Sequence, residues 1–284
     1  MDEMSEIPDF PEPVRRVSRD VWRLDGVTVS ERAVPEETPV ALTYNGTTHA
    51  VMMASPIDIA DFALGFSLTE GIISSPADIL SLDVIAVEDG IEARMWIAEE
   101  KAAVLGARRR AMAGPTGCGL CGVESLAEAI KPAAQVTARP VFPASLILEA
   151  MATLAPAQPL NHETRAVHAA GYFEPGRGLL AVCEDVGRHN ALDKLVGKVV
   201  KLDADPARGI TLLTSRVSIE MVQKAAVLGT PLIAAVSAPT SLAIRTAQAA
   251  GITLAAIVRG DGFELFTHPE RIDLGSSPRH AHVA

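Results

Sequence analysis

Residues 210–236 read ITLLTSRVSIEMVQKAAVLGTPLIAAV, and their pattern is the clearest indication of the fold class. Two short apolar runs, 210–213 and 232–236, flank residues 219–228, whose apolar side chains recur at helical spacing. The same alternation of apolar runs and helical segments continues on both sides. The runs are at 179–183 and 254–258, and the helical segments are at 191–200 and 242–250. Alternation of strands and helices predicts an α/β core in which helices cover a parallel or mixed sheet.

Polar and small residues follow each of the four apolar runs. These segments are 184–190, 214–218, 237–241 and 259–262. Sheets of this kind bind ligands outside the carboxyl ends of their strands, so we expect the four loops to converge on one rim. Arg188, Arg216 and Arg259 would make this rim attractive to an anion. The same loops carry the hydroxyl residues Thr214, Ser215, Ser237, Thr240 and Ser241. Those at 237–241 fit either an anion cradle or an ordinary helix N-cap.

The N-terminal part of the chain has a different pattern. Residues 1–35 mix prolines with charges, which predicts an extended arm. Asn45-Gly46 lies between apolar runs and predicts a hairpin with a type I′ turn, and Asp89-Gly90 is a second hairpin signal. Between them, Ser55-Pro56 opens a helix that ends near Gly71. Residues 36–113 are therefore expected to form an α+β subdomain.

Composition and charge exclude several classes of protein. The chain has 284 residues, of which 48% are hydrophobic, so it can bury a large core. A net charge of −10 argues against nonspecific binding to nucleic acid. There is no run of eighteen apolar residues and no signal-peptide pattern, so we expect a cytoplasmic protein that does not enter the membrane.

The sequence offers two cysteines as a candidate reaction centre. Cys118 and Cys121 lie in GPTGCGLCG at 114–122, and apolar residues then resume at helical spacing. Residues 114–135 are therefore expected to form a glycine-rich loop and a following helix. A cysteine at the start of a helix can have its pKa lowered from about 8.5 to roughly 3.5–7.5, which favours the nucleophilic thiolate. We take Cys118 and Cys121 as the candidate catalytic residues.

Metal binding is the main alternative for this motif. Cys118 and Cys121 could be two of the four ligands of a zinc site. The other two would have to be residues such as Cys183 and a histidine, because the chain has no second C-x-x-C. A zinc deaminase needs H-x-E, and His168-Ala169-Ala170 has alanine where the glutamate must be. We therefore expect no stoichiometric metal, and we expect Cys183, within an apolar run, to be an inert core residue.

Several motifs in one order resemble the FdhD family of formate dehydrogenase accessory sulfurtransferases, over roughly residues 36–273. They are CGLCG at 118–122, EDVGRHNALDKL at 184–195, SAPTSLA at 237–243 and HPERI at 268–272. The resemblance implies a dimer with a cytidine-deaminase-like, three-layer α/β core at 136–273, followed by a C-terminal tail at 274–284. It also implies that the protein takes sulfur from a cysteine desulfurase and delivers it to the molybdenum cofactor of formate dehydrogenase.

The resemblance also implies roles for particular residues. Cys118 would carry the persulfide, and Cys121 would either handle sulfur as well or release the product as a disulfide. The cofactor is a bis(molybdopterin guanine dinucleotide), of which GDP is a partial mimic. The segment after the last core strand would contribute to its site. It consists of Ile257, Val258, Arg259, Gly260, Asp261, Gly262 and Phe263. Gly262 departs from the pattern, because a larger and often basic residue is expected there.

Two functions from other classes remain open. In a dithiol oxidoreductase, Cys118 and Cys121 would cycle through a disulfide, although no strand runs directly into the motif as it does in thioredoxin-like proteins. In a cofactor-binding chaperone without chemistry of its own, the cysteines would have no role.

Overall fold

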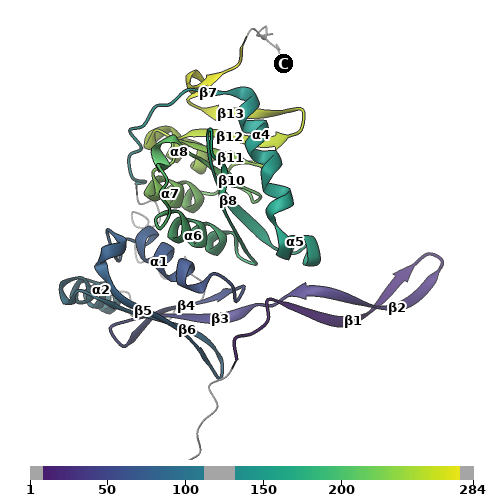
Figure 1. The fold of residues 1–284 in the computed structure, drawn as a ribbon, viewed down its shortest axis with the longest axis vertical. Helices are drawn as coiled ribbons and strands as arrows, with labels where there is room; N and C mark the ends of the chain where they lie inside the picture. Colours follow the sequence, from purple (N-terminus) through teal and green to yellow (C-terminus); the bar gives the residue numbers. More distant parts are fainter. Residues whose placement is uncertain (1–8, 112–131, 276–284) are drawn as a thin grey trace, which may run out of the picture. The chain divides into compact units, whose positions relative to one another are not determined.

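The computed structural model describes residues 9–111 and 132–275 (Figure 1). The chain divides into two compact units that are interleaved along the sequence. The first unit takes in Met1–Pro132, Gln158–Ala170 and Val182–Asp203. The second takes in Ala133–Ala157, Gly171–Ala181 and Ala204–Ala284. This grouping differs from the expected division, which placed all of 136–273 in one core.

A long antiparallel ribbon begins the first unit. It consists of β1 (Val14–Arg23) and β2 (Gly26–Pro35), which pair from end to end, where we expected an extended arm. The signal in the sequence is Asp25-Gly26, because Gly26 has a φ of 136° that favours glycine at the tight turn. Arg32 and Arg16 join the base of the ribbon to Thr164 and Glu163 of α5 (Pro159–Thr164).

The four-stranded sheet of the first unit has the order β4-β3-β6-β5. Its strands are β3 (Thr38–Tyr44), β4 (Thr47–Ala54), β5 (Ile79–Val87) and β6 (Gly90–Ile97). Asn45 and Gly46 have φ values of 47° and 77°, which confirms the predicted turn. The predicted second hairpin is also confirmed, since β5 and β6 are antiparallel. Inward side chains of β3 and β6, such as Leu42 and Met95, are buried.

Two helices of the first unit cross at glycines. They are α1 (Ile59–Thr69), which follows β4, and α6 (Arg188–Val199). A Cβ atom at Gly65 would overlap the carbonyl oxygen of Asp193, and one at Gly197 would overlap that of Asp61. The backbones therefore approach as closely as glycine permits, which explains why α6 groups with N-terminal residues rather than with the rest of the expected core.

The second unit contains most of a six-stranded sheet of order β13-β12-β11-β10-β8-β9. Its strands are β8 (His168–Glu174), β9 (Gly178–Asp185), β10 (Ile210–Leu213), β11 (Leu232–Ala235), β12 (Thr253–Arg259) and β13 (Gly262–Thr267). Strands β10, β11 and β12 are parallel, and β13 is antiparallel to β12. The predicted α/β class with a mixed sheet is confirmed.

Helices cover both faces of this sheet. Figure 1 shows α7 (Ile219–Leu228) and α8 (Ser241–Ala250) on one face and α4 (Ala144–Leu154) on the other. The short strands β7 (Phe142–Pro143) and β14 (Ile272–Asp273) pair beside them. Helix α2 (Glu99–Ala111) also belongs to the first unit. Among the described residues, no helix has both the length and the apolar character needed to cross a membrane.

Candidate functional site

Cys118 and Cys121, the candidate catalytic residues, lie outside the described residues. The described part of the candidate site is the edge of the second unit's sheet at which β10, β11 and β12 end. Because these strands are parallel, their carboxyl ends meet at one edge, and the loops 214–218, 237–241 and 259–262 follow them there. Three of the four expected loops are thus brought together in this unit, and the fourth, 184–190, belongs to the first unit.

Backbone hydrogen bonds join the loops after β10 and β11. Val217 N donates to Ala238 O at 3.3 Å, and Thr240 N donates to Val217 O at 2.9 Å. Val217 and Pro239 form an isolated parallel bridge, so the segments that follow β10 and β11 continue side by side beyond the two strands. The starts of α7 and α8 are therefore held next to each other, and each presents backbone N–H groups and a positive dipole end.

The two helix starts differ in how they are capped. Thr240 caps α8, because its Oγ1 accepts a hydrogen bond from Ala243 N at 3.2 Å. Ser218 is the N-cap residue of α7, yet its buried Oγ makes no cap bond and has no hydrogen-bond partner within residues 9–111 and 132–275. Sequence reasoning missed Ser218, although a serine just before an apolar helical run is a standard N-cap signal.

The expected cofactor segment, Ile257 to Phe263, begins at an irregularity in β12. The pairing of β12 with β13 shifts register between Ala256 and Arg259. Within this bulge, Ile257 has a φ of 53°, a left-handed value that a β-branched residue rarely adopts. Bulges and strained residues of this kind concentrate at functional sites, where they redirect side chains.

Arg259 links the ends of two strands. Its Nη1 donates to Val236 O at 2.5 Å and to Val258 O at 2.9 Å, so one end of the guanidinium is committed to the backbone. The rest of the side chain is exposed. Beyond it, a Cβ atom at Gly260 or Gly262 would meet nothing within 4 Å, so the position where a larger residue was expected is open.

The other expected rim residues vary in exposure. Arg216, Ser241 and Asp261 are exposed, Thr214, Ser237, Thr240 and Phe263 are half-buried, and Ser215 and Val258 are buried. The hydroxyls of Ser241 and Ser215 already have partners, namely Arg245 Nη1 at 2.7 Å and Arg216 O at 3.2 Å. The exposed charged groups at this edge are therefore Arg216, Arg259 and the carboxylate of Asp261, beside the two helix starts.

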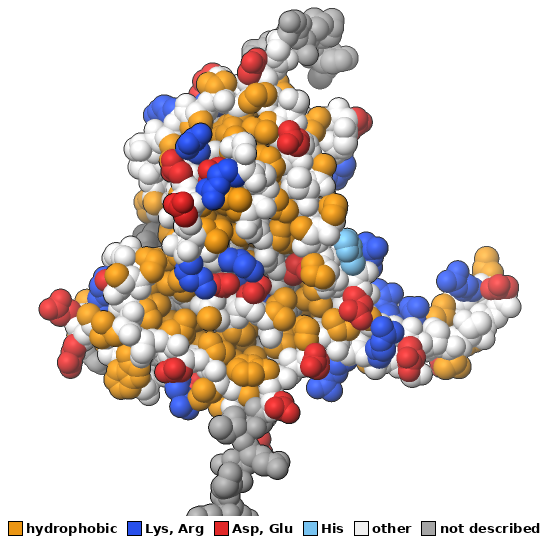
Figure 2. Space-filling view, in the orientation of Figure 1, with side chains coloured by type: hydrophobic (Ala, Val, Ile, Leu, Met, Phe, Trp, Pro, Cys, Tyr) orange, Lys and Arg blue, Asp and Glu red, His pale blue; other side chains and the backbone are white. Residues whose placement is uncertain are grey.

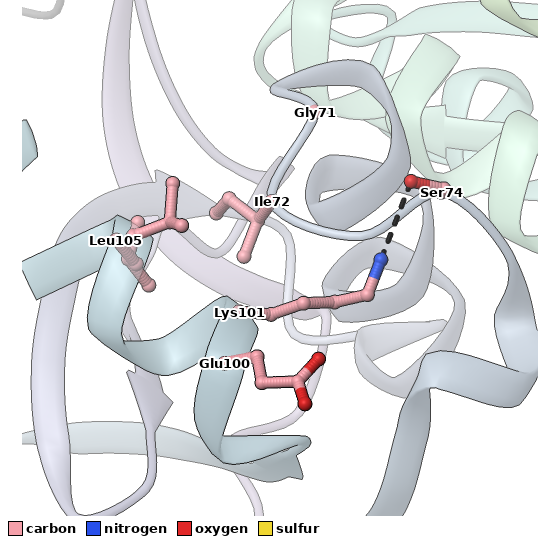
Figure 3. A pocket seen from close by; sticks show the side chains of 7 residues that line it. Gly71, Ile72, Ser74, Glu100, Lys101 and Leu105 are labelled. Atoms are coloured by element: carbon pink, nitrogen blue, oxygen red, sulfur yellow. Dashed lines mark hydrogen bonds between the residues drawn. The ribbon is translucent and has the colours of Figure 1, made fainter.

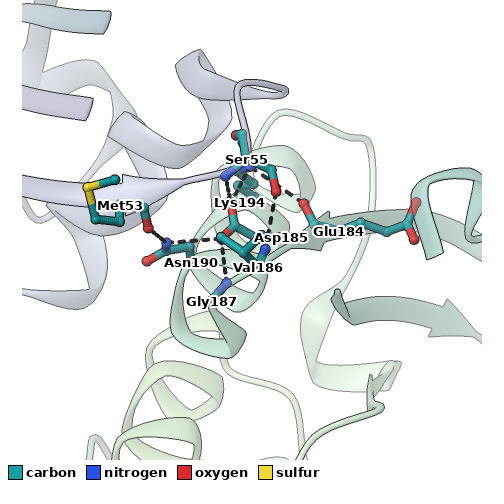
Figure 4. A network of polar contacts seen from close by, with 8 residues as sticks. All are labelled: Met53, Ser55, Glu184, Asp185, Val186, Gly187, Asn190 and Lys194. Atoms are coloured by element: carbon teal, nitrogen blue, oxygen red, sulfur yellow. Dashed lines mark hydrogen bonds and ion pairs between the residues drawn. The ribbon is translucent and has the colours of Figure 1, made fainter. Parts of the chain in front are cut away.

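The loop 184–190 in the first unit is built around a buried ion pair (Figure 4). Lys194 Nζ lies 2.6 Å from Asp185 Oδ2, and both side chains are fully buried. Asp185 also accepts hydrogen bonds from Ser55 N, Gly187 N and Asn190 Nδ2 at 2.7–3.0 Å. Lys194 Nζ donates in turn to Ser55 O at 2.9 Å. These contacts fix the start of α6, where Arg188 and His189 lie.

Arg188 and His168 lie together in the first unit. The Nε of Arg188 is buried without a hydrogen-bond partner among the described residues. Burial, and then the positive charge of Arg188, lowers the pKa of His168, against the opposing effect of Asp185. The adjacent Ala169 and Ala170 are buried in β8, so a proton-shuttling carboxylate of the deaminase type has no counterpart at this position.

Cys183 is an ordinary core residue, as predicted. It is 1% exposed, and burial raises the pKa of its thiol to about 12. The described residues contain no group of three His, Cys, Asp or Glu side chains that could hold a metal ion.

A hollow of about 350 Å³ lies beside α2 in the first unit (Figure 3). Lys101, the cationic side chain among the described residues that line it, donates to Ser74 Oγ at 3.3 Å and pairs with Asp78 at 2.8 Å. The hydrogen bond from Lys101 lowers the pKa of Asp78. Because the ammonium group is already paired, this hollow offers an anionic ligand little charge, and we do not assign it to the site.

Comparisons with known proteins agree on one group of relatives. The model of the FdhD/NarQ family matches residues 35–273. The chain is 54% identical over 261 residues to "Sulfur carrier protein FdhD" of Agrobacterium fabrum, covering 92% of this chain and 96% of that one. It is 52% identical over 263 residues to the protein of the same name from Brucella abortus, covering 91% and 98%. A crystal structure of a candidate formate dehydrogenase accessory protein from Desulfotalea psychrophila superposes with a TM-score of 0.73 at 26% identity, covering 92% of this chain and all of that one.

Proposed function

Because this chain belongs to the FdhD/NarQ family, we propose that it is a sulfur carrier that serves formate dehydrogenase. The observation that carries this proposal is the 54% identity, over 92% of the chain, to a protein named as a sulfur carrier. The pair Cys118 and Cys121 supplies the thiols that such a role needs. In this proposal the protein is a sulfurtransferase, and a cysteine desulfurase is its donor.

The first step is a thiolate displacement on sulfur. The Cys118 thiolate attacks the terminal sulfur of the donor's cysteine persulfide, the donor's sulfur–sulfur bond breaks, and the donor cysteine leaves as a thiolate. Cys118 then carries the persulfide. No electrons are gained or lost overall, since one sulfur–sulfur bond replaces another.

Delivery of the sulfur needs a second displacement, for which Cys121 has two possible roles. If Cys121 resolves the persulfide, its thiolate attacks the Cys118 sulfur, a Cys118–Cys121 disulfide forms and HS⁻ leaves. The two electrons that reduce the sulfane sulfur then come from the thiol pair. If Cys121 instead handles sulfur directly, its thiolate attacks the terminal sulfur of the Cys118 persulfide, the sulfur–sulfur bond breaks, Cys118 leaves as a thiolate and Cys121 then carries the persulfide.

The acceptor in this proposal is the molybdenum cofactor with its two guanine dinucleotides, which is the substrate of the second step. Groups at the edge of the second unit's sheet suit such an anion, because two helix starts, Arg216 and Arg259 all lie at one edge, where Asp261 is the one exposed carboxylate of the three described loops. The first turn of α7 contains Glu220, whereas that of α8 contains no acidic residue, so α8 is the better end for a phosphate. The unpartnered Ser218 Oγ and the open positions at Gly260 and Gly262 fit an added ligand. GDP should therefore bind as a partial mimic.

Several further features of the proposal come from the family resemblance. They are a cytidine-deaminase-like arrangement of the three-layer core, a homodimer, and action in the cytoplasm together with a cysteine desulfurase and formate dehydrogenase. The buried alanines after His168 leave no carboxylate for deamination at this position, so a core of this kind would serve other chemistry.

The decisive experiment is an intact-mass measurement after incubation with a cysteine desulfurase and cysteine. A reducible gain of one sulfur, about 32 Da, is expected on wild type and on Cys183→Ala, and it should be lost in Cys118→Ala. Cys118→Ala should also abolish formate dehydrogenase activity in cells that carry it as their only copy. If the mass changes only by the loss of two hydrogens, the pair forms a disulfide without carrying sulfur, and a dithiol oxidoreductase replaces this proposal.

A further inference from the structure

The start of β8 and the end of β9 lie side by side in the first unit. The two strands are neighbours in the sheet and only residues 175–177 join them, so they are antiparallel and His168 lies beside the end of β9. Helix α6 begins at Arg188, three residues after β9 ends at Asp185. These three residues all belong to the first unit, and the charges of Arg188 and Asp185 both act on the His168 ring.

The carboxylates of this corner are already committed. Asp185 pairs with Lys194, and its two oxygens accept three further N–H groups (Figure 4). The Glu184 side chain extends away from that pair and accepts hydrogen bonds from two backbone N–H groups of α5, at 2.7 and 2.9 Å. Neither carboxylate is therefore left to neutralise Arg188.

Arg188 has no such partner in the described part of the chain. Its Nε is buried and makes no hydrogen bond there, although the residue as a whole is half-buried and can be reached from water. Lys198, near the other end of the same helix, is paired with Asp58. Figure 2 likewise shows basic and acidic side chains interspersed over the surface. Buried N–H groups without an acceptor are rare, and an anion would supply the acceptor for Arg188.

The start of α6 adds to the positive charge of Arg188. Gly187 is the N-cap residue and has no side chain to cap the helix, and the first turn contains no acidic residue. A helix carries a partial positive charge at this end. The His168 ring supplies one more hydrogen-bond donor. Guanidinium, imidazole and helix start thus meet where the described carboxylates are occupied, and this combination favours an anion.

We propose that Arg188, His168 and the first turn of α6 form a phosphate site in the first unit, separate from the proposed cofactor edge of the second unit's sheet. The planar fork of the Arg188 guanidinium matches two phosphate oxygens. Because its charge is permanent and His168 can gain a proton, the site suits a dianion better than a carboxylate. The ligand is a phosphate group, either free or part of a nucleotide. This site requires nothing of the sulfur chemistry proposed above.

The test follows the His168 ring by NMR in the full-length protein, isotope-labelled in its histidines. Its signal is the one that disappears in His168→Asn. Sulfate is the first probe, because it stays a dianion over the pH range in which histidine and phosphate both titrate. An anion beside the ring favours its charged form, so saturating sulfate should raise the pKa of His168 by about 1. By linkage, sulfate should bind about tenfold more tightly once His168 is protonated.

Variants of Arg188 test its part in the site. Arg188→Gln should weaken sulfate binding about ten- to a hundredfold, because it removes charge-assisted hydrogen bonds, and the rise of the His168 pKa with sulfate should disappear. Arg188→Lys keeps the charge without the fork and should keep part of the response. The matched control is Arg165→Gln, which removes an exposed arginine three residues before His168 and should respond like wild type. Far-ultraviolet circular dichroism checks that each variant is folded.

Phosphate and GDP distinguish the two sources of the ligand. A response of His168 to inorganic phosphate shows that free phosphate suffices, whereas a response to GDP alone shows that the nucleotide brings the phosphate group. Guanosine should give no response. Three results would overturn the proposal: a His168 pKa that sulfate, phosphate and GDP all leave unchanged, an equal response in Arg188→Gln, or acetate acting as strongly as sulfate.

Sulfur loading of Cys118, measured by intact mass, is a separate readout. A protein that loads sulfur but shows no anion response at His168 would refute this site and leave the proposed function intact. A protein that shows the response but never loads sulfur would do the reverse.

Discussion

Lys194 Nζ and Asp185 Oδ2 lie 2.6 Å apart, and neither side chain has any exposed surface. Two charges removed from water cost several kcal/mol each in desolvation, which only close pairing and further hydrogen bonds offset. Asp185 has three such bonds and Lys194 donates to the Ser55 carbonyl (Figure 4). The pair thus ties the segment after β4 to the start of α6.

Lys194→Met should destabilise the first unit by about 3–5 kcal/mol, because it leaves a buried carboxylate without its counter-ion. Urea unfolding followed by far-ultraviolet circular dichroism measures this loss of stability. The matched control is Lys198→Met, one turn along the same helix. Its half-exposed pair with Asp58, at 3.4 Å, should contribute no more than about 1 kcal/mol.

A double variant of Lys194 and Asp185 tests whether the unpaired carboxylate causes the loss of stability. If an unpaired charge is what destabilises Lys194→Met, adding Asp185→Asn should cost less in that background than in wild type. Equal losses for Lys194→Met and Lys198→Met would show that the buried pair has no special role in stability.

The crossing of α1 and α6 gives a steric prediction. Gly65→Ala should destabilise the first unit by at least about 1–3 kcal/mol, because its methyl group would overlap the Asp193 carbonyl in a backbone contact that cannot move locally. Gly260→Ala is the control, since a methyl group there meets nothing. A Gly65→Ala protein as stable as wild type, by the same urea measurement, would mean that the helices separate at little cost.

The sequence predicted those parts of the fold that depend on local pattern. The helix at 219–228 has the predicted bounds, because its apolar residues recur at helical spacing and Gly229 ends it at a φ of 89°. The turn at Asn45-Gly46 was predictable because both residues tolerate positive φ. β8 was missed because His168-Ala169-Ala170-Gly171 lacks the β-branched residues typical of a strand, and only its neighbours in the sheet stabilise it.

Long-range contacts explain what sequence patterns did not predict. Lys194 resembles a solvent-exposed helix residue in sequence, and its burial depends on Asp185 and Ser55, which approach only in the folded chain. The grouping of α6 with the first unit depends on glycine contacts between residues more than a hundred positions apart. In the candidate site, the parallel strands made the edge predictable, but the bulge at Ile257 and the backbone contacts of Arg259 were not.

Cys183 provides a pH-dependent prediction. Burial raises its pKa from 9.0 to about 12, so the folded protein keeps this proton at pH values where the unfolded chain loses it. Its contribution to stability is complete below about pH 9 and is lost as the pH rises towards 12. At pH 9–10, iodoacetamide should therefore alkylate Cys183 only after denaturation, as peptide mass spectrometry would report. Rapid alkylation of the native protein at Cys183 would contradict its place in the core.

The last prediction concerns Arg259, whose guanidinium holds the ends of β11 and β12 together and leaves its remaining donors exposed at the proposed cofactor edge. Replacing it with alanine leaves the Val236 carbonyl and a bound anion without a donor, at a cost of about 1–3 kcal/mol. Arg259→Ala should therefore weaken GDP binding roughly five- to a hundredfold in calorimetry. Arg208→Ala is the matched control, because Arg208 is an exposed arginine of the same unit that precedes β10 and so lies at the opposite edge of the sheet. Both variants should still accept a persulfide at Cys118, since the thiol reaction does not involve this edge. Equal GDP affinities in the two variants would remove Arg259 from the site, and loss of persulfide loading in a folded Arg259→Ala protein would show that the two steps are coupled.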